Sequence, residues 1–254
     1  MATAPNSDNY TLGRGRLLFN RKVNGAFTGL RDLGNATNFT LSMSTEKLDH
    51  YSNRQGIRVK DKSVLTSMAI TGSFTLDEIM ADNLAMTFLA SITDVTQTAE
   101  VGQTTEIAKS KKGHYFQLDD KFIDEDSVVV TDATPKTYTV GTDYTIHGPS
   151  GQLFITAGST IADDTALTVT YDTLKKTYKK LNAFDENSVE GELHFISDVA
   201  VGTNMQARMW SVTLMPSGDT GFISDEWNSL EFSLELSSDE ANHALFPYME
   251  LIVE

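Results

Sequence analysis

The chain has 254 residues, contains no cysteine and carries a formal net charge of −15. Its length predicts one or two domains with a substantial core, and the lack of cysteine excludes disulfides, thiolate metal sites and cysteine nucleophiles. The amino-terminal residues lack the apolar core of a signal peptide, and no stretch approaches about 18 apolar residues. We therefore expect a soluble protein that is made in a reducing compartment and does not insert into membranes.

The charge is distributed unevenly along the chain. Residues 1–66 carry ten Lys or Arg against five Asp or Glu, whereas residues 186–254 carry thirteen acids and one base, Arg208. Opposite charges on one chain suit repeated association with copies of itself. The overall sign argues against a grip on nucleic acid, because binding phosphates needs surplus cations.

In chain order, the first predicted element is a β-hairpin over residues 16–27. Asn24-Gly25 is a type I′ turn signal, because both central residues must tolerate positive φ. Alternating residue patterns then predict two strands, one over 39–43 and a returning strand over 64–76.

The polar segment between these two strands, residues 44–63, is long for a loop without a function. It lacks the Gly, Ser and Pro bias of a slack linker. We interpret it as an arm that becomes ordered against something outside its own domain; the alternative is a long, mobile hairpin. The residues that we expect at a contact between subunits are Leu48, Asp49, Tyr51, Arg54, Ile57, Arg58, Lys60 and Lys62.

A helix is predicted over residues 82–91, with Asp82 as its cap. An apolar stripe at helical spacing, which we expect to pack in the core, comprises Leu84, Ala85, Phe88, Leu89 and Ile92.

The sequence pattern changes over residues 97–185 to short β segments separated by turn residues, which is typical of a small β-sandwich-like module. Residues 148–151 (Gly-Pro-Ser-Gly) are predicted to close a hairpin within it. The basic segment 174–181 permits either a helix or a strand. We therefore expect a main domain made of residues 1–96 and 186–254, with 97–185 inserted.

The last part of the chain is predicted to be β again, with strands over 189–196, 205–215 and 227–236. The third strand alternates sharply, with apolar Leu and Phe on one side and Glu231, Ser233 and Glu235 on the other. The first strand shows Glu190, Glu192 and His194 on one face in the same way. If these two strands are neighbours, their carboxylates form one acidic wall.

No catalytic constellation stands out, and we expect neither enzyme activity nor a cofactor or metal. The five histidines show no ligand spacing. The acids at 119, 120 and 124–126 lack the spacing and glycine of a calcium loop, so a solvated face is the favoured interpretation. Trp210 and Trp227 could stack on sugars, but both lie in β patterns where core packing is favoured.

Three stretches together resemble the major tail tube protein of long-tailed (siphovirus-type) bacteriophages. They are the arm, LDHYSNRQGIRVKDKSV, with its basic R-x-K-D run; the helix entry DNLAMTFLA; and residues 189–232, with the pattern P-S-G-D followed by D-E-W. The similarity covers roughly residues 12–99 and 181–254, and it leaves the insertion 97–185 outside the family pattern.

The resemblance implies a tail-tube-type β-barrel or β-sandwich flanked by a helix. Six copies would close into a ring, and rings would stack into a tube through the long arm. The channel would hold the tape measure protein during assembly and pass double-stranded DNA at infection. Further partners would be the tail terminator and the distal tail or baseplate proteins, and the location would be the virion, after synthesis in the bacterial host cytoplasm.

Under this resemblance, residues 97–185 would lie on the tube exterior, and acids would keep DNA from sticking to the channel wall. The candidate lumen-lining acids are Glu190, Glu192, Glu231 and Glu235; the opposite face of the same strands could look inward instead. Three alternatives remain open: a β-sandwich adhesin or carbohydrate-binding module, a β-sandwich hydrolase, and another tail ring component such as the distal tail protein or the terminator.

Overall fold

The computed structural model describes residues 10–54 and 56–253, and the chain divides into two compact units. Unit 1 comprises residues up to Ile92 and from Leu181 onward, and unit 2 comprises Thr93–Lys180. The fold is mainly β, with 54% strand and 5% helical residues. Unit 2 begins and ends a few residues earlier than the insertion that we expected over 97–185.

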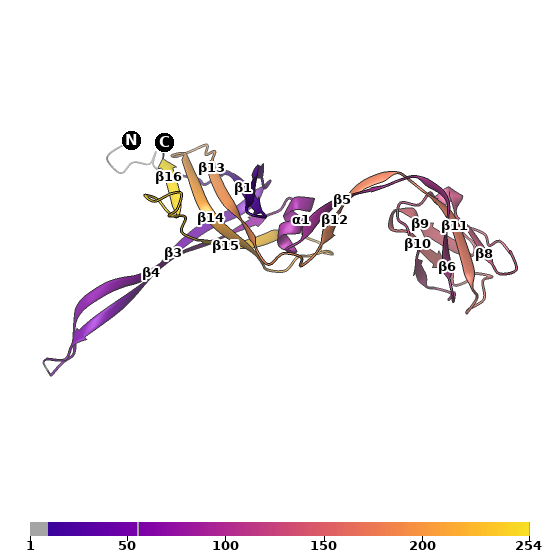
Figure 1. Cartoon of the computed structure of the whole chain (residues 1–254), viewed down its shortest axis with the longest axis horizontal. Helices are drawn as coiled ribbons and strands as arrows, with labels where there is room; N and C mark the ends of the chain where they lie inside the picture. Colours follow the sequence, from indigo (N-terminus) through magenta and orange to yellow (C-terminus); the bar gives the residue numbers. More distant parts are fainter. Residues whose placement is uncertain (1–9, 55, 254) are drawn as a thin grey trace. The chain divides into compact units, whose positions relative to one another are not determined.

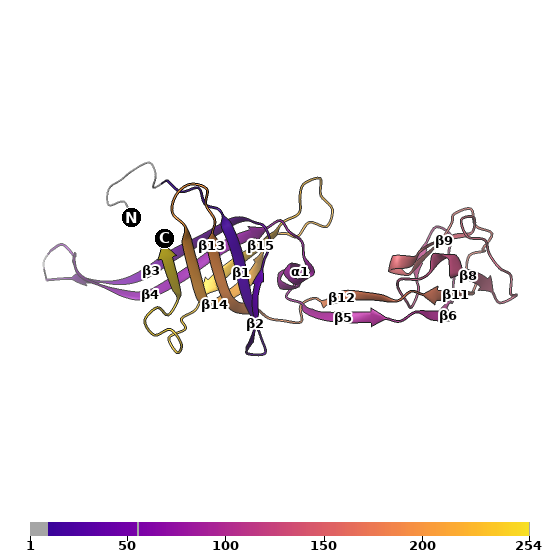
Figure 2. The ribbon, with the colours of Figure 1, turned by 90° about the horizontal axis from the view of Figure 1, so that it is seen from above.

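Unit 1 is built on one antiparallel sheet with the strand order β2-β1-β13-β14-β15-β4-β3. Two strands pair with the same side of β14: β16 with its first half and β15 with its second half. Figure 2 shows β1, β13 and β14 side by side in this sheet. The strands are β1 (Gly15–Val23), β2 (Ala26–Asp32), β3 (Ala36–Ser52), β4 (Val59–Leu76), β13 (Val189–Ser197), β14 (Met205–Ser217), β15 (Leu230–Leu236) and β16 (Met249–Val253).

The sheet is open, with β2 and β3 as its edge strands. Within the described residues it does not close into a barrel, so the barrel that we considered from the sequence is not formed by a single chain. The expected hairpin turn is confirmed: β1 and β2 are joined by Asn24 and Gly25, with φ of 50° and 82°. This pair of positive φ values is the requirement of a type I′ turn.

One face of the sheet forms the core of unit 1. Along β15, buried Leu230, Phe232, Leu234 and Leu236 alternate with more exposed residues, as predicted. Phe232 stacks on Phe74 of the neighbouring β4, with ring centroids 5.0 Å apart. Each fully buried side chain of this size contributes about 1.5–3 kcal/mol through the hydrophobic effect, so this face holds the sheet together.

The helix α1 (Ala81–Thr87) packs Met86 against the same core, and it is shorter than predicted. Met80, not Asp82, is the N-cap residue; Asp82 lies in the first turn, where a carboxylate favours the helix dipole. The helix ends early because Leu89 adopts a left-handed conformation with φ of 47°. Leu84 of the predicted stripe packs against the core from within the helix, and Leu89 does so from beyond its end.

Unit 2 contains two three-stranded antiparallel sheets around one core. One sheet has the order β6-β11-β8 and the other β7-β10-β9. Buried Val169 and Tyr171 of the first sheet and Leu153 and Ile155 of the second belong to the same cluster, which fits the expected sandwich-like module. The strands are β6 (Glu100–Ile107), β7 (Tyr115–Gln117), β8 (Val129–Asp132), β9 (Tyr144–His147), β10 (Gln152–Ile155) and β11 (Leu167–Thr173).

Two short 3₁₀ turns, η2 (Glu125–Ser127) and η3 (Gly148–Ser150), complete unit 2. η3 joins β9 to β10, so the predicted hairpin is confirmed. Where the chain passes between the units, β5 (Ser91–Gln97) pairs with β12 (Lys176–Asn182) in a two-stranded sheet. The basic segment that permitted a helix or a strand is thus a strand.

Asp143 is the main buried carboxylate of unit 2, with 5% of its surface exposed. Its two oxygens accept hydrogen bonds from the backbone N–H groups of Thr139 (2.9 Å) and Thr160 (2.7 Å) and from the Ser159 hydroxyl (3.2 Å). These bonds favour the charged form and lower the pKa of Asp143 to about 2. The carboxylate therefore ties the β9 entry to the loop before Ile161.

We predict that Asp143→Asn destabilises unit 2 by about 1–3 kcal/mol at neutral pH, because an amide NH₂ cannot accept the bond from a backbone N–H. In the wild type, the stabilisation by this carboxylate is present above its ordinary pKa of 3.8 and is lost as the pH falls toward about 2. Hydrogen exchange of residues 138–161 in the full chain, measured from pH 7 to 2, tests both statements.

Asp164→Asn is the matched control for this variant, because the Asp164 side chain is 78% exposed and makes only a 3.9 Å ion pair. It should leave the exchange rates unchanged. Equal protection in Asp143→Asn and the wild type at neutral pH would contradict the structural role of Asp143.

Candidate interaction surfaces

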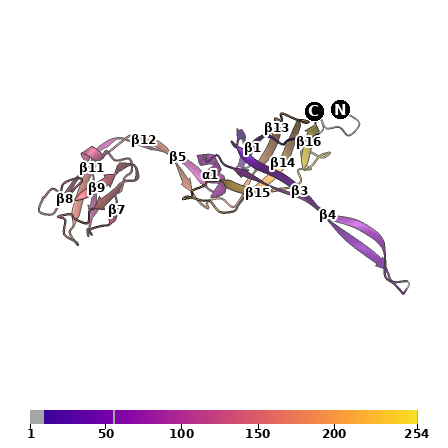
Figure 3. The ribbon, with the colours of Figure 1, turned by 180° about the vertical axis from the view of Figure 1, so that it is seen from behind.

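The predicted arm is itself a two-stranded β-ribbon. β3 and β4 pair from Ala36 opposite Leu76 to Ser52 opposite Val59. β15 pairs with β4 only as far as Ile70, so the rest of the hairpin continues past the sheet, as Figures 1 and 3 show. We expected strands over 39–43 and 64–76; in the structure the first runs from Ala36 to Ser52 and the second begins at Val59, and bulges shift the register of the pair at three places.

Cross-strand polar contacts hold the distal half of this ribbon together. Lys60 Nζ lies 2.7 Å from Asp49 Oδ1, and the Ser63 hydroxyl donates to the same oxygen at 2.7 Å. These two hydrogen bonds, Lys60 first, lower the pKa of the Asp49 carboxyl. The Arg58 guanidinium lies 5.0 Å from the centre of the Tyr51 ring, a cation–π contact next to the tip.

The eight predicted contact residues all lie on the ribbon or its tip. Leu48, with 67% of its surface exposed, and Ile57, with 79%, cover nothing within the single chain. Arg54 and Lys62 make no ion pair with the residues that the structure describes. Lys60 and Arg58, in contrast, are used inside the ribbon. The predicted contact residues thus include exposed apolar side chains and two cations, Arg54 and Lys62, that have no ion pair among the described residues.

The face of the sheet opposite the core is polar. In one row across five strands, Glu190 of β13 lies opposite Thr213 of β14, which lies opposite Glu235 of β15, followed by Thr71 and Ser42. Directly opposed residues of antiparallel strands project from the same face. A second row places Glu231 between Ser217 and Thr75.

The expectation of adjoining acidic strands is therefore corrected. β13 and β15 are separated by β14, so hydroxyl groups alternate with the carboxylates. Glu192 is also partly engaged: it lies 2.6 Å from His194 and accepts a 3.5 Å bond from Asn20. On β15 and on the adjoining residues 70–76 and 36–43, however, no Lys or Arg occurs. We name this part the hydroxyl–carboxylate face.

Neither tryptophan is a core residue, contrary to the prediction. Trp210 stacks on His243 with ring centroids 3.9 Å apart and donates to the Phe246 carbonyl at 2.9 Å. Trp227 is 97% exposed, because β15 begins only at Leu230 and Trp227 lies in the preceding loop. The same loop, residues 218–229, exposes Phe222 and Ile223. This exposed loop was not predicted from the sequence. The signal that could have indicated it is the presence of Phe222, Ile223 and Trp227 among turn-forming residues.

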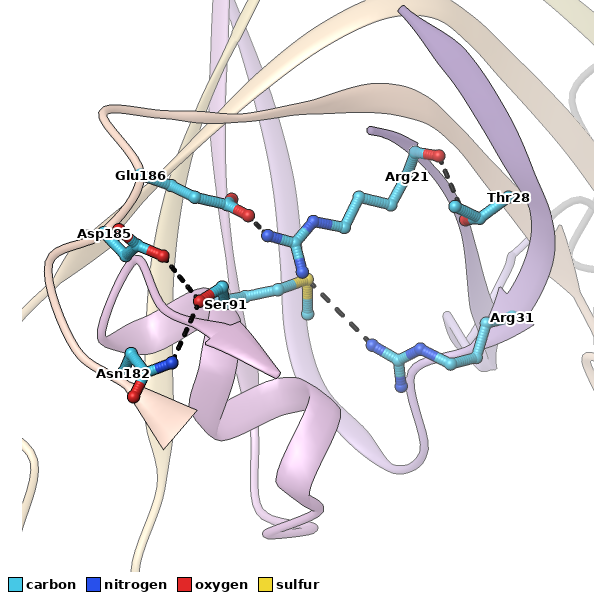
Figure 4. A network of polar contacts seen from close by, with 8 residues as sticks. Arg21, Thr28, Arg31, Ser91, Asn182, Asp185 and Glu186 are labelled. Atoms are coloured by element: carbon cyan, nitrogen blue, oxygen red, sulfur yellow. Dashed lines mark hydrogen bonds and ion pairs between the residues drawn. The ribbon is translucent and has the colours of Figure 1, made fainter. Parts of the chain in front are cut away.

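A second feature that the sequence analysis missed is an open pocket of about 400 Å³ formed by β1, β2 and α1. Figure 4 shows Arg21 and Arg31 extending into this region from the two strands, on either side of a sulfur atom. Arg21 forms an ion pair with Glu186. Arg31 donates to Asn83 Oδ1 at 3.0 Å and to the Asp32 carbonyl at 3.3 Å. We name this site the arginine pocket.

Beside it, the Ser91 hydroxyl donates to Asp185 at 2.6 Å and accepts a 3.4 Å bond from Asn182.

The acids at 119–126 are used as hydrogen-bond acceptors within unit 2. Asp119 accepts from Thr105, Asp120 from Tyr171, and Asp124 from the Asp126 backbone. Among the described residues, no three His, Cys, Asp or Glu side chains are arranged to hold a metal ion. Nor does any helix in that part of the chain have the length and apolar character needed to cross a membrane.

Comparison with other proteins assigns the chain to a family. A family model described as "Protein of unknown function UCP028589" matches residues 10–251, nearly the whole chain. No curated protein matches the chain significantly.

We predict that the pKa of Asp49 lies below its ordinary value and rises toward it in Lys60→Ala, because that variant removes the main hydrogen-bond donor to the carboxylate. Carboxyl ¹³C chemical shifts followed through a pH titration measure this directly. Lys62→Ala is the control, since Lys62 lies opposite His50 and, unlike Lys60, makes no ion pair or hydrogen bond with Asp49 among the described residues. An identical Asp49 titration in Lys60→Ala and the wild type would show that the ribbon contact does not persist in solution.

Proposed function

The chain belongs to the family of proteins of unknown function UCP028589, and we propose that it is a structural subunit that polymerises into a tube, as the major tail tube protein of a long-tailed bacteriophage does. The observation that carries this proposal is the β3–β4 ribbon, which continues past the sheet with exposed apolar side chains. An isolated two-stranded hairpin is at best marginally stable in water. Docking on a neighbouring copy would bury those side chains.

The open sheet supports the same proposal. Its two edge strands, β2 and β3, leave hydrogen-bonding groups that can pair with another chain. Six sheets joined in this way would make one continuous barrel around a channel, although a single copy closes none. Edge pairing between different edges is heterologous, and such contacts build rings or filaments.

The hydroxyl–carboxylate face supports the orientation of the sheet in such a tube. A channel that passes DNA must not hold it, and binding phosphates requires cations. Glu231 and Glu235 repel phosphates, while the neighbouring Thr and Ser residues are neutral and small. In this proposal that face lines the lumen, and unit 2 is carried on the exterior.

The proposal includes the partners of a tail tube. The subunit would contact itself within and between rings, the tape measure protein inside the channel, and the tail terminator and the distal tail or baseplate proteins at the tube ends. DNA would pass without adhering. The protein would be made in the host cytoplasm and function in the virion.

We predict that shortening the ribbon abolishes tube formation and leaves the fold intact. Lys47 lies opposite Leu65, so replacing residues 48–64 by Asn-Gly closes the hairpin with a two-residue turn. Electron microscopy and sedimentation velocity should show tubes for the wild type and monomers or single rings for the shortened chain. Circular dichroism and the thermal midpoint should be unchanged.

Two results would contradict this prediction. If the shortened chain unfolds, the ribbon belongs to the core of unit 1. If it forms tubes at the wild-type concentration, the ribbon is not the contact that stacks the rings. A wild-type chain that remains monomeric at high concentration would overturn the proposed function itself.

We predict that Glu231→Lys with Glu235→Lys permits tube assembly but makes the tube retain DNA, because four units of charge per subunit are reversed on the proposed lumen wall. Retention should disappear as salt is raised, and genome delivery by particles built from the variant should slow. The control is Asp163→Lys with Asp164→Lys in unit 2, which makes the same charge change. Equal retention of DNA by both variants would mean that Glu231 and Glu235 face outward.

A further inference from the structure

The loop of residues 218–229, between β14 and β15, is an unusual surface for a single chain, and we name it the aromatic loop. Ile223 and Trp227 are 99% and 97% exposed, and Phe222 is 78% exposed. Phe222 stacks on Phe88 at 6.0 Å between ring centroids, which anchors the loop at the end of α1. Exposed apolar clusters of this kind mark interaction sites.

The aromatic loop also carries acids beside its apolar residues. Asp225 and Glu226 directly precede Trp227, and the whole stretch 221–228 is exposed. The Glu226 backbone N–H donates to the Ser224 hydroxyl at 3.0 Å, which makes a turn out of the segment that holds the acids. A partner for this loop therefore needs an apolar recess with cations at its rim.

The arginine pocket has this chemistry. Its accessible apolar surface comes from Val23 and Leu30, which are 38% and 48% exposed, because Phe19 and Met86 are buried. Arg21 and Arg31 contribute two guanidinium groups. Arg21 is matched by Glu186, whereas no carboxylate of the described residues lies within ion-pair distance of Arg31. Burial, opposed by the attraction of Asp82 and reinforced by the charge of Arg21, lowers the pKa of Arg31.

We propose that the aromatic loop of one copy inserts into the arginine pocket of the next copy, with Trp227 on the apolar surface and an acid of the pair Asp225 and Glu226 at Arg31. This inference rests on the proposed function and names the contact between neighbouring subunits. The occupant is a second copy because the acids of the loop complement the charge of Arg31, which has no ion-pair partner among the described residues; Asp82 also lines the pocket, and Arg21 is already paired with Glu186. A free anion would satisfy Arg31 but would leave Leu30 and Val23 uncovered.

The geometry of this contact also fits a growing assembly. The loop and the pocket are different surfaces of unit 1, so a copy that offers its loop to one neighbour still presents its pocket to another. Such a heterologous contact propagates from copy to copy, unlike the self-matching contact of a two-fold dimer. It is distinct from the ribbon, which lies at the other end of β4 from the residues that border α1.

A charge-reversal experiment in trans tests the contact. In the full-length chain, Asp225→Lys with Glu226→Lys reverses the loop, and Arg31→Glu reverses the pocket. Each variant alone should fail to assemble, or should need at least about 10-fold more protein, because like charges meet at every contact. A 1:1 mixture should recover assembly, because alternating copies place opposite charges at every contact. Sedimentation velocity and electron microscopy report the outcome.

Trp227→Ala is the second loop variant, and it should raise the concentration needed for assembly about 10-fold or more, as loss of a buried tryptophan anchor does. Leu245→Ala, an 85% exposed apolar residue of another loop of unit 1, is its control. Lys109→Glu in unit 2 is the control for charge reversal. Both controls should assemble at the wild-type concentration.

The outcomes separate this inference from the proposed function. If the wild type assembles and both Trp227→Ala and the reversed loop assemble equally well, the inference is wrong and the proposed function stands. If the reversed variants fail singly and their mixture also fails, while Arg31→Glu retains the wild-type circular dichroism, the loop and pocket do not meet. If Arg31→Glu unfolds, the two exposed-loop variants decide the question.

Discussion

The one-sided burial of a single antiparallel sheet is the constraint from which the rest of unit 1 follows. Phe74, Phe232 and their neighbours fill one face together with α1. Because successive side chains of a strand point to opposite faces, fixing this face fixes the other, and the register of β13, β14, β15 and β4 then brings glutamates, serines and threonines into rows. Core packing and surface chemistry are thus two results of one strand register.

The ribbon has a different physical basis. Beyond Ile70, β4 has only β3 as a partner, so its hydrogen bonds and cross-strand contacts must hold the hairpin without a core. Exposed ion pairs such as the one between Lys60 and Asp49 contribute little to stability, because solvent screens the two charges. The ribbon is a regular hairpin with little stability of its own. Such an element is suited to packing against a neighbouring molecule.

Short-range patterns could be predicted from the sequence, whereas contacts between distant segments could not. The alternation in β15 and the Asn24-Gly25 turn depend on neighbouring residues and were correct. The arm over residues 44–63 was predicted, but its pairing into a ribbon was not, because the register that places polar residues such as Asp49 opposite Ser63 cannot be read from the sequence. Trp227 was assigned to a strand by extending an alternation three residues too far. The arginine pocket is formed by residues of β1, β2 and α1, so no single stretch of the sequence predicts it.

The paired passages β5 and β12 have a consequence for how such a chain evolves. Thr96 and Thr177 touch at 3.2 Å, and Lys179 lies 3.4 Å from Asp94, so the two ends of the stretch that they enclose are held together. A segment whose ends already meet imposes almost no closure entropy on its host, whatever its length. Residues 98–175 can therefore be replaced by another inserted segment, or removed, while the sheet of unit 1 keeps its register.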